Sequence, residues 1–315
     1  MQAIWLLCAC IPALAAGPEC IVPSKPSGAM DVTCKLVKKE WDGAASAGSR
    51  GMRISYLPGG IGAVAWHALV SQRRAEADTL VAFSGGSLLN LAQGKFGKGR
   101  AADVRWVAAF GADYGMVAVR ADSEFHTLAD LLKALKQHPE RVLIGMGGTV
   151  GSQDWVKMAL LARLGGVDPK VLRFVALEGG GEAFTAMQAG LVQAVSGDAS
   201  EATLMADAGK IRVLAVLSEQ RLPGRLAHVP TAREQGFDVV WPIIRGVWMG
   251  PDVRDADYQR WVAAFDRMLA ESTFAEARRR AGLYPFALTG TQLTSYIDKA
   301  VADYGKRASG LGLMR

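Results

Sequence analysis

Short apolar runs that end in glycine-rich loops recur along most of the chain, and an amphipathic stretch follows each loop. The run at 79–83 ends in Ser84-Gly85-Gly86-Ser87, for example, and the run at 141–146 continues into Gly147-Gly148-Thr149-Val150-Gly151. Repeated units of strand, glycine loop and helix are typical of mostly parallel sheets flanked by helices, so we predict an α/β fold. The runs expected to be strands are 19–23, 52–57, 79–83, 104–110, 115–120, 141–146, 172–177, 191–195, 211–217 and 245–249.

The pattern restarts near residue 120, where Thr127 is expected to cap a helix whose leucines recur at helical spacing over 128–135. A restart of this kind indicates two sheets, and 315 residues are enough for two domains of ordinary size. After about residue 250 the chain reads as helical, and Thr289 with Gln292 predicts a capping box at its last helix. We expect this tail to pack back on the first sheet.

The chain is mildly basic, with a formal net charge of +6 and a pI near 9.2. Its Lys and Arg residues are scattered, and the densest runs, Lys38-Lys39, Arg73-Arg74 and Arg278-Arg279-Arg280, lie in segments of helical character. Solvated helix faces explain such runs better than a nucleic-acid patch does, so we expect no nucleic-acid partner. A positive excess does favour anionic ligands by long-range attraction.

The amino terminus indicates export. The apolar stretch Ile4 to Ala16 is too short to span a bilayer, and Ala13-Leu14-Ala15 fits the small-x-small pattern of a signal-peptidase site. We therefore predict a signal peptide over 1–16 and a periplasmic location; the alternative is a buried N-terminal strand. No other stretch approaches the apolar length of a membrane span, so the mature protein is expected to be soluble.

Cysteine and histidine usage argues for a disulfide and against a metal site. Cys8 and Cys10 lie inside the predicted signal, which leaves Cys20 and Cys34 as a disulfide candidate in an oxidising compartment, or as two separate buried thiols. The chain has no CxxC motif and no Cys/His cluster, and its four histidines show no metal-ligand spacing. We expect no metal and no cofactor.

The glycine loops are the places where a ligand is expected. In open parallel sheets, ligands bind at the carboxyl ends of the strands, where each following helix offers free N–H groups and a partial positive charge. Such helix termini bind a carboxylate without a cationic side chain, and the hydroxyls of Ser27, Ser84, Ser87, Thr149 and Ser152 would add donors. The alternative for any single loop is plain turn chemistry.

Enzymatic interpretations find little support. The sequence has no nucleophile elbow, phosphate-loop lysine or zinc-protease motif. Gly60-Ile61-Gly62-Ala63-Val64-Ala65 matches a dinucleotide-binding fingerprint, but the next strand ends in Ser84 instead of the acidic residue that this site requires. We predict a binding protein and not an enzyme.

An ordered set of motifs resembles the substrate-binding proteins of tripartite tricarboxylate transporters, also called the Bug family. The loop from Val22 to Asp31 looks like the family's Pro-x-x-Pro-Gly-Gly-x-x-Asp segment, and Pro58-Gly59-Gly60-Ile61-Gly62 looks like its second glycine loop. The resemblance covers about residues 19–313. Further matches in order and spacing are Gly151-Ser152-Gln153-Asp154, Glu178-Gly179-Gly180-Gly181, Gly197-Asp198 and Val229 to Gly236.

The resemblance implies a two-lobed periplasmic-binding-protein fold of type II, with two crossing strands as the hinge. Lobe 1 would comprise 17–117 and 243–315, and lobe 2 would comprise 118–242. The implied function is capture of a small di- or tricarboxylate by cleft closure, by a monomer that delivers the ligand to integral-membrane transporter subunits. The alternatives are a ligand-binding sensor for a signalling partner and, with less support, an α/β enzyme.

The resemblance also implies a set of ligand-binding residues on both lobes. Asp154 and Asp198 would cap helices or accept from ligand hydroxyls, and Arg245 would pair with a distal carboxylate or form a salt bridge. The sequence departs from the family pattern at two places: Ser27 and Ala29 carry side chains in the first loop, and Leu57 precedes the second loop. Both departures affect which acid is bound. The expected site residues are Ser27, Gly28, Ala29, Met30, Asp31, Gly59, Gly60, Ser84, Ser87, Gly148, Thr149, Ser152, Gln153, Asp154, Gly180, Asp198 and Arg245.

Overall fold

The computed structural model describes residues 17–26, 28–44, 50–206 and 209–314, so the predicted signal peptide over 1–16 lies outside the described residues. The strands are β1 (Glu19–Val22), β2 (Arg53–Tyr56), β3 (Thr79–Ser84), β4 (Arg105–Arg120), β5 (Leu143–Gly147), β6 (Arg173–Leu177), β7 (Ala194–Asp198), β8 (Ile211–Val216), β9 (Pro242–Met249) and β10 (Leu288–Thr289). The helices are α1 (Ala29–Ala44), α2 (Ala63–His67), α3 (Gly85–Ala92), α4 (Leu128–Gln137), α5 (Gln153–Leu164), α6 (Gly180–Gln188), α7 (Ala199–Ala206), α8 (Asp255–Ala270), α9 (Ser272–Arg280) and α10 (Gly290–Gly310). Among these described helices, none is both long enough and apolar enough to cross a membrane.

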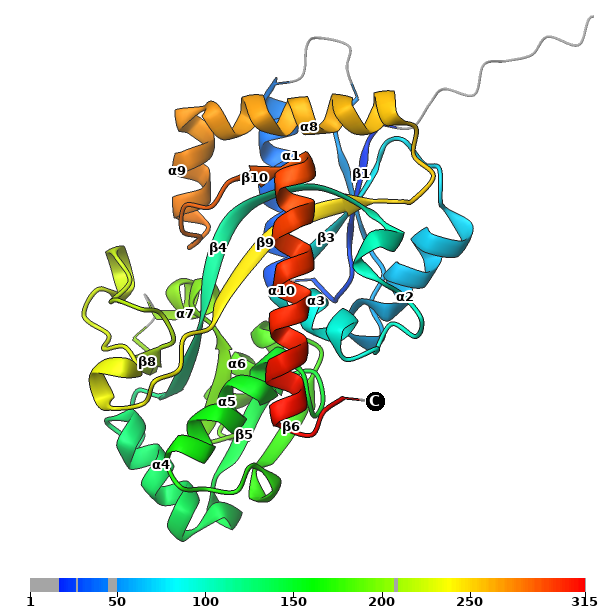
Figure 1. Ribbon diagram of the computed structural model, residues 1–315. Coiled ribbons are helices and arrows are strands. Elements are labelled where there is room, and N and C mark those ends of the chain that lie inside the picture. Colours follow the sequence, from blue (N-terminus) through cyan, green and yellow to red (C-terminus); the bar gives the residue numbers. More distant parts are fainter. Residues whose placement is uncertain (1–16, 27, 45–49, 207–208, 315) are drawn as a thin grey trace, which may run out of the picture.

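Two sheets share the long strand β4 (Figure 1). In the first, the order is β2-β1-β3-β9-β4, with β1 parallel to β2 and β3, and β9 antiparallel to β3 and β4. In the second, β5 lies parallel to β6 and β7, while β4 is antiparallel to β7 and β8. Helices pack on both sheets, so the predicted mixed α/β fold with two sheets is confirmed.

The strands β4 and β9 run together from one sheet toward the other and are the two crossing strands that the resemblance implied (Figure 1). The sequence predicted separate strands at 104–110 and 115–120, and that prediction is wrong, because β4 is continuous through residues 111–114. These central residues pair with β9 from Gly111 opposite Arg245 to Tyr114 opposite Pro242. Backbone pairing to a distant strand therefore keeps residues 111–114 extended, although the sequence analysis left them between two separate strands.

The start of β7 also differs from the expected 191–195. The strand begins at Ala194, and Leu191 lies in the preceding turn with 66% of its surface exposed. The turn follows α6, where Gly190 adopts a positive φ of 75°. The apolar Leu191 thus lies in the turn between α6 and β7, and β7 ends at Asp198, three residues beyond the expected end at residue 195.

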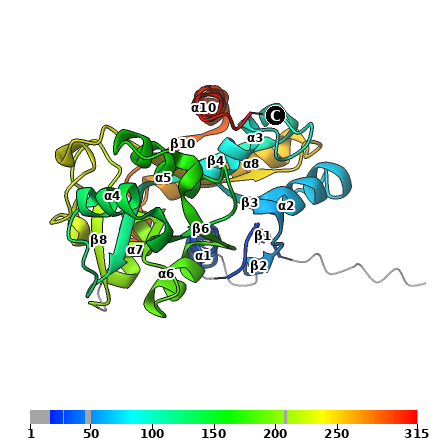
Figure 2. The ribbon, with the colours of Figure 1, turned by 90° about the horizontal axis from the view of Figure 1, so that it is seen from below.

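The helical tail packs across both sheets. Leu293 and Ile297 of α10 belong to a core cluster with residues of β3 and β9, whereas Ala308 near its end belongs to a cluster built largely on α4 and α5. Seen from below, α10 lies end-on at one side of the molecule (Figure 2). The predicted capping box is wrong: Thr289 makes no cap hydrogen bond, and its hydroxyl donates to Asp266 at 2.6 Å.

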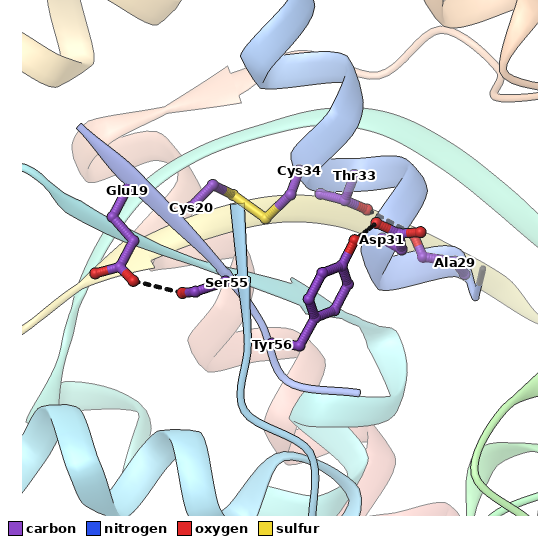
Figure 3. Close-up of a disulfide and its surroundings, with 8 residues drawn as sticks. All are labelled: Glu19, Cys20, Ala29, Asp31, Thr33, Cys34, Ser55 and Tyr56. Atoms are coloured by element: carbon purple, nitrogen blue, oxygen red, sulfur yellow. Dashed lines mark hydrogen bonds between the residues drawn. A yellow bond between two sulfur atoms is a disulfide. The ribbon is translucent and has the colours of Figure 1, made fainter. Parts of the chain in front are cut away.

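A disulfide fixes the start of α1 to the first sheet (Figure 3). Cys20 on β1 bonds Cys34 on α1, both side chains are fully buried, and the predicted pairing is confirmed. One turn earlier on α1, the buried Asp31 accepts from the Tyr56 hydroxyl at 2.9 Å. These contacts hold the first turn of α1 beside the carboxyl ends of β1 and β2.

Candidate ligand-binding cleft

A cleft of about 270 Å³ lies between the two sheets and is lined from both sides. This volume lies at the small end of ordinary ligand pockets, which suits a metabolite of a few carbon atoms. The carboxyl-end loops of strands in both sheets surround it. Its lining residues are Pro23, Ser24, Gly28, Ala29, Met30, Gly60, Ser84, Gly86, Ser87, Asn90, Gly147, Gly148, Thr149, Ser152, Gln153, Asp154, Ala176, Leu177, Glu178, Gly179, Gly180, Asp198, Glu201 and Arg245.

First turns of five helices border this cleft: α1 and α3 on one side, and α5, α6 and α7 on the other. Ser84 caps α3 by accepting from the N–H of Gly86 at 3.1 Å, and Ser152 caps α5 by accepting from the N–H of Trp155 at 3.3 Å. The cap position of α6 is Gly179, which has no side chain to offer. Helix amino termini carry partial positive charge, so their convergence favours an anion in the cleft.

The floor of the cleft is a network of buried charges. Lys157 on α5 lies 2.8 Å from an oxygen of Asp154 and 2.9 Å from one of Asp198. Arg245 on β9 pairs with Asp198 and also with Asp113 on β4, the latter at 2.8 Å. All five side chains are at least nine-tenths buried. Buried charges are stable only when partners surround them, and here each cation bridges two acids.

The charges of this network determine which of its members are ionised. Burial acts to raise the pKa of Asp198, but the charges of Lys157 and Arg245 outweigh burial and hold that pKa below its ordinary value. Burial acts to lower the pKa of Lys157, yet Asp154 and Asp198 raise it above the ordinary value. Asp198 is therefore ionised, and Lys157 is a fixed cation beneath the cleft.

Two polar atoms in this floor have neither a hydrogen-bond partner nor an ion-pair partner among the described residues. One is Nε of Arg245, and the other is the side-chain oxygen of Gln153, whose amide nitrogen donates to both oxygens of Asp198 at 3.2 Å. Both residues line the cleft. A donor and an acceptor are thus left for water or for a ligand.

Most of the residues expected from the sequence lie around this cleft, but not all of them do. Asp31 does not line it and instead pairs with Lys35 at 2.7 Å, and Gly59 also lies outside the lining. Ser27 falls outside the described residues. Those that line the cleft are Gly28, Ala29, Met30, Gly60, Ser84, Ser87, Gly148, Thr149, Ser152, Gln153, Asp154, Gly180, Asp198 and Arg245.

Three buried charged residues at or beneath the cleft were not anticipated: Asp113, Lys157 and Glu201. Lys157 had a signal in the sequence, because it interrupts the apolar segment that surrounds it in α5. Asp113 likewise interrupts an apolar strand. Glu201 follows Gly197-Asp198 closely, but its neighbouring sequence does not distinguish it from a residue on the surface of a helix.

A metal-binding arrangement is absent from the part of the chain that the structure describes, where no three His, Cys, Asp or Glu residues are grouped to hold an ion. The acids of the cleft floor are instead bound to Lys157 and Arg245.

Two α/β lobes, two crossing strands and a cleft between them form the fold of type II periplasmic binding proteins. The model of the "Tripartite tricarboxylate transporter family receptor" matches residues 100–313, and the chain belongs to this family. No curated protein sequence matches the chain.

Solved structures of similar fold support the same class. A Rhodopseudomonas palustris protein described as MatC with bound malate has a TM-score of 0.80 at 19% identity, covering 93% of this chain and 99% of that one. An R. palustris protein with adipate has a TM-score of 0.83 at 20% identity, covering 95% and 98%. The periplasmic binding protein BugD has a TM-score of 0.83 at 15% identity, also covering 95% and 98%. At these identities the likeness concerns the fold.

Proposed function

We propose that the protein is an extracytoplasmic receptor that captures a small di- or tricarboxylate between its lobes and delivers it to the membrane subunits of a tripartite transporter. The observation that carries this proposal is the convergence of five helix amino termini on one cleft of about 270 Å³. Backbone N–H groups at such termini hold carboxylate oxygens without a neutralising side chain. Malate and adipate, the ligands of two proteins of similar fold, are small dicarboxylates.

Closure of the lobes about β4 and β9 would bring the two halves of the site onto the ligand. One part-buried hydrogen bond already crosses the cleft, from the N–H of Ala29 to Glu201 at 3.2 Å. Two exposed polar contacts also cross it: Lys25 with Glu182 at 3.1 Å, and Lys95 with the carbonyl oxygen of Val150 at 3.2 Å. Exposed polar contacts of this kind contribute little, so a ligand that bridges the lobes would shift the balance toward the closed form.

The test is a thermal-shift screen of protein unfolded and refolded to remove carried-over ligand, against succinate, malate, citrate and adipate. An acid present at 100 times its Kd should add about 2.7 kcal/mol of stability, seen as a shift of a few degrees. No shift with any of the four acids would contradict the proposal.

The site assignment has its own test in Ser152→Ala. Loss of the cap leaves the first turn of α5 less ordered, at a cost of about 1 kcal/mol, and removes a hydroxyl from the cleft. Affinity for the acid found in the screen should fall several-fold. His126→Ala, an exposed residue outside the cleft, is the matched control and should bind as the wild type does. Equal affinity in both variants would contradict the assignment.

A further inference from the structure

Glu201 occupies the place where a ligand carboxylate is expected. It lies in the first turn of α7, is 8% exposed and lines the cleft. One of its carboxyl oxygens accepts a hydrogen bond from the N–H of Ala29, the first residue of α1 on the opposite lobe, at 3.2 Å. An internal acid thus takes a backbone donor that the proposed site would offer to its ligand.

The second oxygen of Glu201 lies against the first turn of α6. A Cβ atom placed on Gly180 would be only 1.8 Å from it, so the carboxyl group fits there because residue 180 has no side chain. The carboxyl group is therefore held between two helix amino termini, α1 from one lobe and α6 from the other. An anion in this position gains from both helix dipoles.

Glu201 has no cation of its own. Among the described residues it makes no ion pair, because Lys157 and Arg245 are bound by the other acids of the floor. A ligand carboxylate brought beside an ionised Glu201 would add like charge to a site already short of cations. Several other charged groups face Glu201 or its helix neighbours. Those of the cleft floor are Asp198 on β7, Asp154 and Lys157 on α5, Asp113 on β4 and Arg245 on β9. The others are Glu182 on α6, which pairs with Lys25, and Asp31 on α1, which pairs with Lys35.

The ionisation of Glu201 follows from these surroundings. Burial, and next the negative charge of Asp198, raise the pKa of Glu201 to about 8. In the free protein the group therefore changes charge in mildly alkaline solution.

We propose that Glu201 is a specificity-determining residue of the cleft, which admits a dicarboxylate only with a proton on Glu201, so that above neutral pH ligand binding takes up one proton. For each protein molecule in which Glu201 is ionised, binding of one dianion is accompanied by binding of one proton from solvent. The protonated carboxyl group of Glu201 can then donate a hydrogen bond to a ligand oxygen. This proposal rests on the proposed function, because it presumes an anionic ligand.

The experiment is isothermal titration calorimetry with malate and adipate as probes, at pH 6.5 and pH 9, in pairs of buffers that differ in ionisation enthalpy. Wild-type protein should take up about 0.9 proton per ligand at pH 9 and almost none at pH 6.5, and affinity should fall by up to about tenfold per pH unit above 8. Glu201→Gln keeps the shape without the charge and should bind with no proton uptake and constant affinity. Glu124→Gln, an exposed residue outside the cleft lining, is the control and should behave as the wild type.

The outcomes separate the two proposals. Binding without proton uptake at pH 9, or the same loss of affinity with pH in Glu201→Gln, would overturn the role of Glu201 and leave the proposed function intact. If neither probe binds, the thermal-shift screen with all four acids decides. If another acid binds, the same calorimetry is repeated with that acid; if none binds, both proposals are overturned. Should Glu201→Gln fail to fold, proton uptake by the wild type alone remains decisive.

Discussion

Arg245 on β9 and Asp113 on β4 form an ion pair of 2.8 Å between the two strands that connect the lobes. The same guanidinium also binds Asp198 at the end of β7, and Asp113 accepts from the N–H of Ser200 at 3.0 Å. One buried arginine therefore ties the hinge strands to the loop that lines the cleft in the second lobe.

Removing this arginine should destabilise the protein strongly. In Arg245→Met, Asp113 and Asp198 lose their shared cation while remaining buried, which typically costs about 3 to 5 kcal/mol. Urea unfolding should show the loss as a lower midpoint. The control is Arg74→Met, which breaks a pair with Asp252 in which both side chains are about half exposed; its unfolding midpoint should change far less than that of Arg245→Met. Similar losses in the two variants would mean that the buried network contributes no more than a surface pair.

Glu201 should make stability depend on pH. Its pKa in the folded protein, about 8, lies above the ordinary value of 4.5, so the unfolded chain releases this proton first as pH rises. The stabilisation from the bound proton is complete below about pH 4.5 and is lost progressively up to about pH 8. Relative to Glu201→Gln, the free energy of unfolding of the wild type should fall by up to about 1.4 kcal/mol per pH unit in this window. Urea titrations at pH 5, 6, 7 and 8 measure the difference, and a difference independent of pH would contradict it.

Alanine substitutions at Gly180 and Gly179 form a matched pair that tests how tightly the Glu201 carboxyl group is packed. A Cβ at residue 180 would overlap that group, whereas one at residue 179 meets no atom within 4 Å. Gly180→Ala should lower the free energy of unfolding by about 1 to 3 kcal/mol. Gly179→Ala should leave it within about 0.5 kcal/mol. Thermal unfolding of the two proteins side by side tests this, and equal midpoints would show that Glu201 moves aside without cost.

The disulfide should contribute substantially to stability. The cysteines are 14 residues apart, and closing a loop of this length restricts the unfolded chain by about 3 kcal/mol in the chain-entropy model. Replacing both Cys20 and Cys34 with Ala should cost about that amount in guanidinium unfolding. A reducing agent should lower the stability of the wild type and leave the double variant unchanged; a wild type insensitive to reduction would contradict the prediction.

Features set by neighbouring residues could be predicted from the sequence. Thr127 caps α4 by accepting from the N–H of Asp130 at 3.1 Å, as the local pattern indicated. The predicted strand at 79–83 ends one residue later, at Ser84, and its Gly-Ser loop opens α3. Apolar periodicity and turn chemistry act over a few residues, so they can be read without the fold.

The charges of the cleft floor could not be predicted in the same way. Asp113 and Arg245 are 132 residues apart, and Lys157 and Asp198 are 41 apart. The apolar segments around Asp113 and Lys157 indicate burial, but they do not show which distant charge is the partner, and burial becomes tolerable only when the fold supplies that partner. The sequence by itself determined the α/β class, most of the strands and the glycine loops, and it indicated the disulfide candidate and the family resemblance. The tertiary structure alone decided which acids are paired and that Glu201 lies between two helix amino termini, because these contacts depend on how distant segments meet.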